Sequence, residues 1–157
     1  MIIARPPSLQ REYDDFWSGD PAIIPSPDGE PDYSVWRDRI ARARETGDWT
    51  DVLVAGETPT KFTLRPITAH QFALLVDYAN GHAAALVNEL AFRLAFVRVS
   101  NLGANADLEY EAHPEFGKLC TTSFLDKAGV TAAVALLIIQ EIGGAALTRA
   151  SQLPPKR

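Results

Sequence analysis

Residues 123–151 read SFLDKAGVTAAVALLIIQEIGGAALTRAS and decide the fold of this chain. Thirteen consecutive residues, 128–140, carry no charge, and Glu141 and the pair Gly143-Gly144 follow. Ser123 and Asp126 have the spacing of a capping box, which favours a helix start before this run. The pattern predicts a helix over residues 123–143 that is buried on nearly all sides, and that the glycine pair kinks or ends.

The composition indicates one globular domain. A chain of 157 residues matches the length of a single domain and can bury a sizeable core. The net charge is −5, with −6 in residues 1–60 and +1 in residues 61–157. An acidic front half disfavours nucleic acid, whose binding depends on neutralised phosphates, and it disfavours anionic membrane surfaces.

Cysteine and histidine usage predicts no cofactor and no metal. Cys120 is the single cysteine, which excludes an intramolecular disulfide. Its side chain is predicted to be buried and to act as a small hydrophobic residue. His70, His82 and His113 have no metal-ligand spacing. Nucleophile-elbow, dinucleotide-binding and phosphate-loop motifs are absent from the sequence.

Residues 1–33 contain six of the eleven prolines together with four aromatic residues. Because proline removes backbone donors and disfavours helix before it, the segment is predicted to be an extended arm. The aromatic residues predict that the arm docks, either on its own domain or on a neighbouring subunit. The candidate partner-binding residues are Tyr13, Phe16 and Trp17, with Leu153 beyond the last helix.

Local patterns predict further elements between the arm and the last helix. Ser34 as N-cap and Gly47 as stop predict a helix over residues 34–46, with four arginines on its solvated face. Residues 51–55 and 61–65 predict a β-hairpin. A capping box of Thr68 and Gln71 begins a helix to residue 79, and a second helix is predicted over residues 82–99. The predicted fold is therefore mainly α: three to four helices around the C-terminal helix, with a small hairpin. The arm 1–33 precedes a single domain 34–157.

Three stretches resemble the small tail assembly chaperones of tailed bacteriophages. They read KFTLRPIT at 61–68, NELAFRLAFVRVSNLG at 88–103 and IGGAALTRASQLPPKR at 142–157. The resemblance covers about the last two-thirds of the chain. It implies a mainly helical, non-enzymatic protein that binds tail tube or tape-measure proteins or neighbouring virion subunits, and that can form a homo-oligomer. It also implies a location in the host cytoplasm or the virion.

No signal peptide is evident at the start, and the uncharged run is shorter than the roughly twenty residues that span a bilayer. Three alternatives to the chaperone hypothesis stay open. In the first alternative, the chain is a structural virion protein that holds neighbouring subunits through its arm. In the second, it is a small enzyme that uses His113 and the glutamates near it. In the third, it is an inhibitor that binds a host factor through its acidic front half.

Overall fold

The computed structural model describes residues 11–103 and 107–152, which fold into a small α+β structure. A three-stranded antiparallel sheet has the order β1 (Tyr13–Asp15), β2 (Lys61–Leu64), β3 (Phe96–Ser100). A second sheet is the hairpin β4 (Tyr110–His113) and β5 (Gly117–Cys120). The helices are α1 (Asp32–Thr46), α2 (Ala69–Ala79), α3 (Ala84–Ala95), α4 (Ser123–Lys127) and α5 (Ala132–Ser151). A short 3-10 helix, η2 (Thr50–Val52), follows α1.

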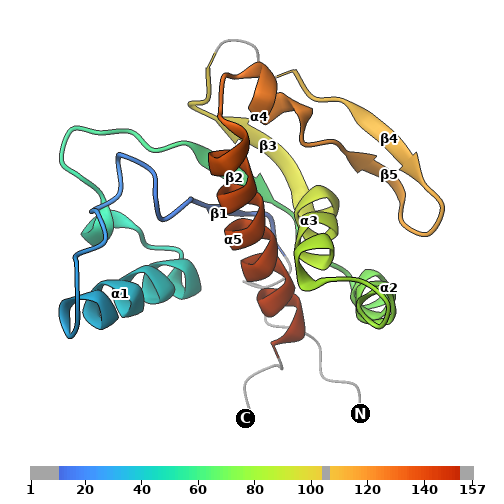
Figure 1. The fold of residues 1–157 in the computed structure, drawn as a ribbon, viewed down its shortest axis with the longest axis horizontal. Helices are drawn as coiled ribbons and strands as arrows, with labels where there is room; N and C mark the ends of the chain where they lie inside the picture. The colour runs from blue at the N-terminus through green and yellow to red at the C-terminus, as the bar shows by residue number, and fades with distance from the viewer. Residues whose placement is uncertain (1–10, 104–106, 153–157) are drawn as a thin grey trace.

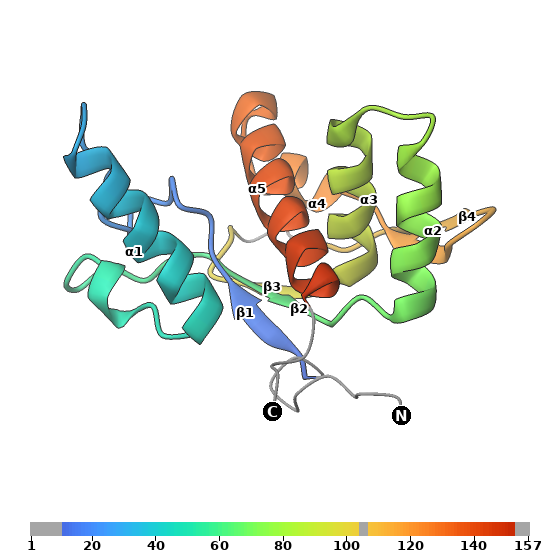
Figure 2. The ribbon, with the colours of Figure 1, turned by 90° about the horizontal axis from the view of Figure 1, so that it is seen from below.

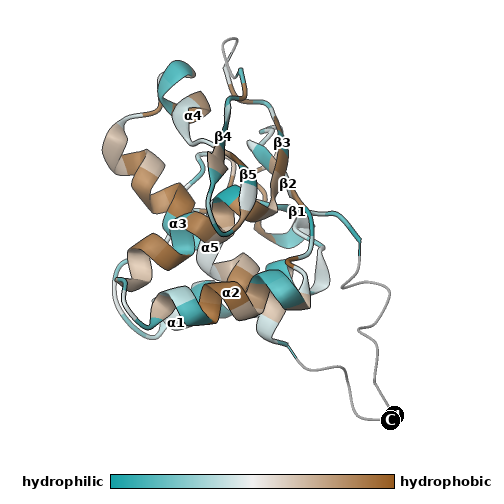
Figure 3. Ribbon diagram, turned by 90° about the vertical axis from the view of Figure 1, so that its right-hand side faces the viewer, coloured by the Kyte–Doolittle hydropathy of each residue, from teal (hydrophilic) through white to brown (hydrophobic). Residues whose placement is uncertain are grey.

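The helices α2, α3 and α5 lie side by side on one face of the three-stranded sheet (Figure 2). In Figure 1, α5 runs across the front of the sheet, α1 lies apart on the left and the β4–β5 hairpin extends at the upper right. Figure 3 shows how strongly hydrophobic α3 and α5 are where they meet. The main core therefore forms between this helix layer and the sheet, with Phe62, Phe92 and Phe124 at its centre.

The prediction of a mainly helical fold with an extended N-terminal arm was wrong. Helix accounts for 47% of the residues and strands for 16%, in two separate sheets. Tyr13–Asp15 is a strand that pairs with β2, so this part of the predicted arm belongs to the sheet of its own chain. The pairing joins residues about fifty positions apart, which no local pattern in the sequence indicates.

The predicted hairpin of residues 51–55 and 61–65 was half wrong. Lys61–Leu64 is a strand, as its alternating pattern predicts, but its partners are β1 and β3. Residues 50–52 form η2, and Leu53 makes an isolated bridge with Ile23. The backbone groups of residues 52 and 54 bond to residues 22–24, so this apolar run pairs with the proline-rich segment before it.

The helix predicted over residues 82–99 ends at Ala95, and the chain passes directly into β3. The residues that follow include Val97 and Val99, whose β-branched side chains suit a strand. The capping box of Thr68 and Gln71 is confirmed at the start of α2. Helix α1 begins at Asp32 rather than after Ser34, and Gly47 ends it in the left-handed conformation, as predicted.

The helix predicted over residues 123–143 is two helices. Gly129, at φ 86°, separates α4 from α5, and Thr131 caps α5 by accepting a hydrogen bond from the Val134 amide. The glycine pair neither kinks nor ends the helix, since α5 continues to Ser151. Gly143 instead lies against α3: a Cβ atom on it would be 2.1 Å from the carbonyl oxygen of Asn88. The glycine is therefore required for the close approach of the two helices.

The described residues form two hydrophobic cores. The main core contains side chains from α2, α3, α5 and the sheet. The second contains Ile23, Ile40, Ala43, Trp49 and Val52, packed by Phe16, Trp36 and Leu53. All eight of these residues belong to residues 16–60, the connection between the paired strands β1 and β2, which we call the front lobe. The domain division at residue 33 stays a prediction.

The glycine pair gives a direct test of the α3–α5 contact. Gly143→Ala is expected to lower the free energy of unfolding by about 3 kcal/mol, because the added methyl group meets backbone that cannot move aside. Gly144→Ala is the matched control: its Cβ would be 3.7 Å from the nearest atoms. Alanine there is expected to be neutral or to stabilise the helix by up to about 1 kcal/mol. Urea unfolding of both variants measures these changes. Equal changes in the free energy of unfolding for the two variants would contradict the close-contact role of Gly143.

Candidate functional site

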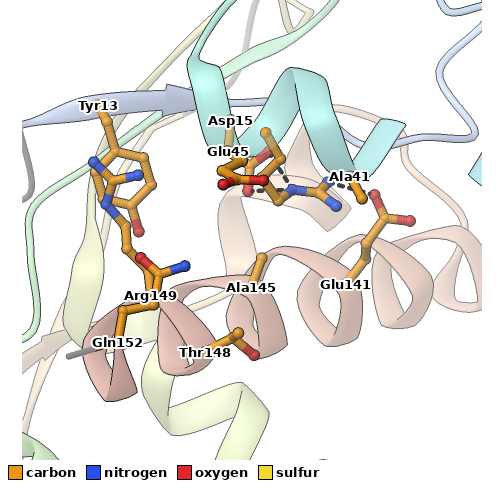
Figure 4. Close-up of a pocket in the computed structure, with 10 residues that line it drawn as sticks. Tyr13, Asp15, Ala41, Glu45, Glu141, Ala145, Thr148, Arg149 and Gln152 are labelled. Atoms are coloured by element: carbon orange, nitrogen blue, oxygen red, sulfur yellow. Dashed lines mark hydrogen bonds and ion pairs between the residues drawn. The ribbon is translucent and has the colours of Figure 1, made fainter. Parts of the chain in front are cut away.

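A cleft of about 380 Å³ lies between α1 and α5, with β1 at its base (Figure 4). The front lobe contributes one wall through α1, and the last helix contributes the other. The side chains that line the cleft are Tyr13, Asp15, Ala41, Arg44, Glu45, Glu141, Ala145, Thr148, Arg149 and Gln152. Five of these ten residues are charged, so the cleft is the place where the two hydrophobic cores meet through polar groups.

Arg44 connects three parts of the chain. Its Nε donates to both carboxylate oxygens of Asp15 on β1, at 2.9 and 3.1 Å. Its Nη2 donates to the carbonyl oxygen of Phe16 at 3.0 Å and to Oε2 of Glu141 on α5 at 2.8 Å. Glu141 also accepts hydrogen bonds from the amide and hydroxyl of Ser18. One guanidinium group therefore holds α1, β1 and α5 in a single network.

Asp15 is the most deeply buried member of this network, with 1% of its surface exposed. Burial raises the pKa of its carboxyl, and the attraction of Arg44 lowers it by less. Arginine stays charged in proteins, so the positive charge in the network is permanent. A carboxylate that is removed from water in this way depends on its partner, because an unpaired buried charge is very costly.

Tyr13 and Arg149 form the other end of the cleft. The Arg149 guanidinium carbon lies 3.9 Å from the centroid of the Tyr13 ring, which is close cation–π geometry. Burial raises the pKa of Tyr13 above its ordinary value, and the charge of Asp15 raises it further. The phenol therefore stays protonated, and the pair closes the cleft beside the C-terminal end of α5 (Figure 4).

Some polar groups of the cleft bond to one another, and others bond to neighbouring backbone and side chains. Asp15 and Glu141 share Arg44, and the hydroxyl of Thr148 donates to the carbonyl oxygen of Gly144 within α5. The lining side chains include neither histidine nor cysteine. The arrangement is that of an ion-pair network that fastens the front lobe to the body of the protein.

The aromatic residues predicted to bind a partner all pack within their own chain. Tyr13 lies in β1 under Arg149. Phe16 packs on the edge of Trp49, with ring centroids 5.0 Å apart. Trp17 packs against the main core. Each remains partly exposed, and their role in partner binding stays a prediction. Leu153 lies outside the described residues.

Two of the carboxylates near His113, those of Glu109 and Glu111, form ion pairs with different cations. Glu109 pairs with Lys127, and that hydrogen bond lowers the pKa of Glu109. Glu111 pairs with Arg93. Nδ1 of His113 accepts a hydrogen bond from the Glu115 amide. In residues 11–103 and 107–152, no three histidine, cysteine or carboxylate side chains come together as metal ligands. Cys120 is 3% exposed, which confirms that it is a buried hydrophobe.

The first half of α5 has an exposed apolar face, where the sequence predicts burial on nearly all sides. Leu136 and Leu137 are each 56% exposed, and Ala132 and Ala133 beside them are also exposed. The predicted burial was wrong because the main core covers one side only, through residues such as Ile138 and Ile142.

Among the described helices, α5 is also the one long and apolar enough to cross a membrane by length and composition. A helix in the core of a folded domain passes the same test, so this finding is weak evidence for a membrane. Packing on α3 and the ion pair of Glu141 place α5 within the folded domain.

Sequence reasoning did not find the network of Arg44 and Glu141. The sequence assigns Arg44 to a solvated helix face together with three other arginines, and nothing local distinguishes it. The one available indication is Glu141, a single charge that interrupts an apolar helix. A carboxylate in such a place predicts a partner, although it does not reveal which residue the partner is.

Comparison with protein-family models, with curated proteins and with solved structures finds no match to this chain.

The dependence of Asp15 on Arg44 can be measured. Arg44→Met is expected to lower the free energy of unfolding by about 3 kcal/mol, because it leaves a buried carboxyl without its partner. Adding Asp15→Asn to this variant is expected to restore part of the loss, since the uncompensated charge is then gone. Arg42→Met, on the exposed side of α1, is the control, with an expected change within about 0.5 kcal/mol. Equal losses at positions 42 and 44 in urea unfolding would contradict the role of the network.

Proposed function

We propose that this protein is a non-enzymatic, protein-binding component of phage tail or virion assembly, acting as a tail assembly chaperone does. The observation that carries the proposal is the exposed, uncharged face of the first half of α5. Two adjacent leucines there are each 56% exposed, and the exposed alanines beside them continue the apolar patch. An apolar surface of this kind is typical of a contact with another protein chain.

The composition of this face supports a protein partner. Its exposed residues are Ala132, Ala133, Leu136 and Leu137, and the next turn adds Gln140. Gln140 is itself fixed: its Nε2 donates to the carbonyl oxygen of Ala85, and its Oε1 accepts from Asn88. The face therefore rests on a rigid pair of helices. A preformed apolar surface with no charge to desolvate loses little on binding.

Leu86, at the beginning of α3, is a further exposed leucine. It is 44% exposed and follows Ala85, the residue whose carbonyl group accepts a hydrogen bond from Gln140.

The phage setting is supported by the resemblance in residues 61–68, 88–103 and 142–157. In this proposal the partners are tail tube, tape-measure or neighbouring virion proteins, and the protein acts in the host cytoplasm or in the virion. Self-association through the same face is the homo-oligomeric form of the proposal. The acidic front half supports partners other than nucleic acid.

Affinity capture from cells that produce the natural set of proteins tests the proposal. Leu137→Glu is expected to abolish recovery of the partner, because a carboxylate at the centre of an apolar contact must be desolvated without a counter-ion. Val35→Glu is the matched control: Val35 is 58% exposed on α1, far from this face, and its change is expected to leave recovery intact. Circular dichroism verifies that both variants are folded.

Light scattering on the purified chain separates self-association from partner binding. Recovery of a tail or head protein that only Leu137→Glu loses supports the proposal. Recovery of no protein by a monomeric wild-type chain, or equal loss with both variants, contradicts it.

A further inference from the structure

We propose that residues 16–60 form a hinged lobe, and that Arg44 is the latch that holds this lobe closed against α5. The lobe is the segment of chain between two strands that pair with each other. Strands β1 and β2 are direct antiparallel partners, with Asp15 opposite Phe62. The front lobe leaves the sheet after Asp15 and returns just before Lys61, so both of its connections lie at the same edge of the molecule.

The lobe has the means to hold its own shape. Its core of Ile23, Ile40, Ala43, Trp49 and Val52 is separate from the main core. Two backbone hydrogen bonds tie residues 22–24 to residues 52–54, and the indole Nε1 of Trp36 donates to the carbonyl oxygen of Ile24 at 2.8 Å. Because these contacts lie within residues 16–60, they can persist while the lobe changes its position.

The contacts that join the lobe to the body fall into two groups. One group lies near the connections: Trp17 packs on the main core, and Asn101 bonds to the carbonyl group of Thr58 and to the hydroxyl of Thr60. The other group is the cleft, where Arg44 reaches Asp15 and Glu141, and where the amide and hydroxyl of Ser18 also donate to Glu141. The first group acts as the hinge, and the second closes the lobe.

Helices α1 and α5 are joined across the cleft by the ion pair of Arg44 with Glu141 and by few other contacts, which favours opening. Helix α1 packs mainly on η2 of its own lobe, while α5 packs mainly on α3. Between α1 and α5 lies a cavity of about 380 Å³, and the two helices make few direct contacts with each other. Interfaces between units with separate cores permit relative motion unless they are large and hydrophobic. Opening would expose the sides of Tyr13 and α5 that line the cleft.

A distance measurement between paired spin labels tests the latch on the full chain. One pair joins the lobe to the body, with Asp38→Cys on α1 and Ala133→Cys on α5. The reference pair lies within the body, with Asp77→Cys on α2 and the same Ala133→Cys. All three sites are exposed. Cys120 is buried and takes no label, and the chain without added cysteines verifies this.

The latch is removed by Arg44→Gln, and Arg42→Gln on the same helix removes an equal charge as the control. The lobe-to-body distances are expected to become longer and broader in Arg44→Gln, to stay narrow in Arg42→Gln, and the reference pair is expected to be unchanged. Should Arg44→Gln fail to fold, Glu141→Ala removes the α5 half of the latch together with the hydrogen bonds from Ser18, and leaves the pair of Arg44 with Asp15 intact. It is expected to shift the same distances by a smaller amount.

Two results would overturn the proposal. Unchanged lobe-to-body distances in both latch variants would show that the hinge and the Trp17 contact hold the lobe without Arg44. Broadening of the reference pair together with the lobe pair would show that the lobe and the body lose their structure together. The test does not depend on the assembly role, because no partner is present in it.

Discussion

The contact between α3 and α5 at Gly143 is the constraint on which the rest of the structure depends. The Asn88 carbonyl group occupies the space of a Cβ atom on this residue, so the two helices come as close as backbones allow. This spacing sets both helices on the same face of the sheet and encloses the phenylalanine cluster of the main core. It also sets the rotation of α5 about its own axis, and with it the direction of every other α5 side chain.

That rotation gives α5 two nearly opposite faces, one of which stays partly exposed. Glu141 and Gly143 are two residues apart, or roughly 200° around the helix, so they face nearly opposite sides. Gly143 faces α3, and Glu141 faces Arg44 on α1. Leu137 lies one turn before Glu141, outside both contacts, and stays exposed. One helix therefore packs the core, contacts the front lobe and leaves an apolar surface exposed.

The two proposals concern different properties of this helix. The proposed partner surface is rigid, because hydrogen bonds of Gln140 fix it to α3. The front lobe is held by charges across a cavity, and such a contact can change without loss of the main core. A buried carboxylate such as Asp15 adds little net stability even with its partner, but separating it from Arg44 would leave a buried charge unpaired, which is strongly destabilising. The polar cleft thus sets the position of the lobe, whereas the apolar cores supply the folding free energy.

What the sequence by itself determined is local. The capping box at Thr68, the stop at Gly47 and the strand at residues 61–64 all follow from residues near one another in the chain, because propensity and capping act over a few positions. The burial of Cys120 was predicted from its residue type alone. Tertiary structure decided the rest. Strand β1 formed because an edge of β2 was available, and Gly143 served as a contact point because α3 lies against it. Arg44 became the centre of the candidate site because Asp15 and Glu141, 29 and 97 positions away, converge on it. Which strands pair, which side chains are exposed and which residue pairs with a buried charge all depend on which distant segments meet. Hydrophobic periodicity along the chain does not indicate those meetings.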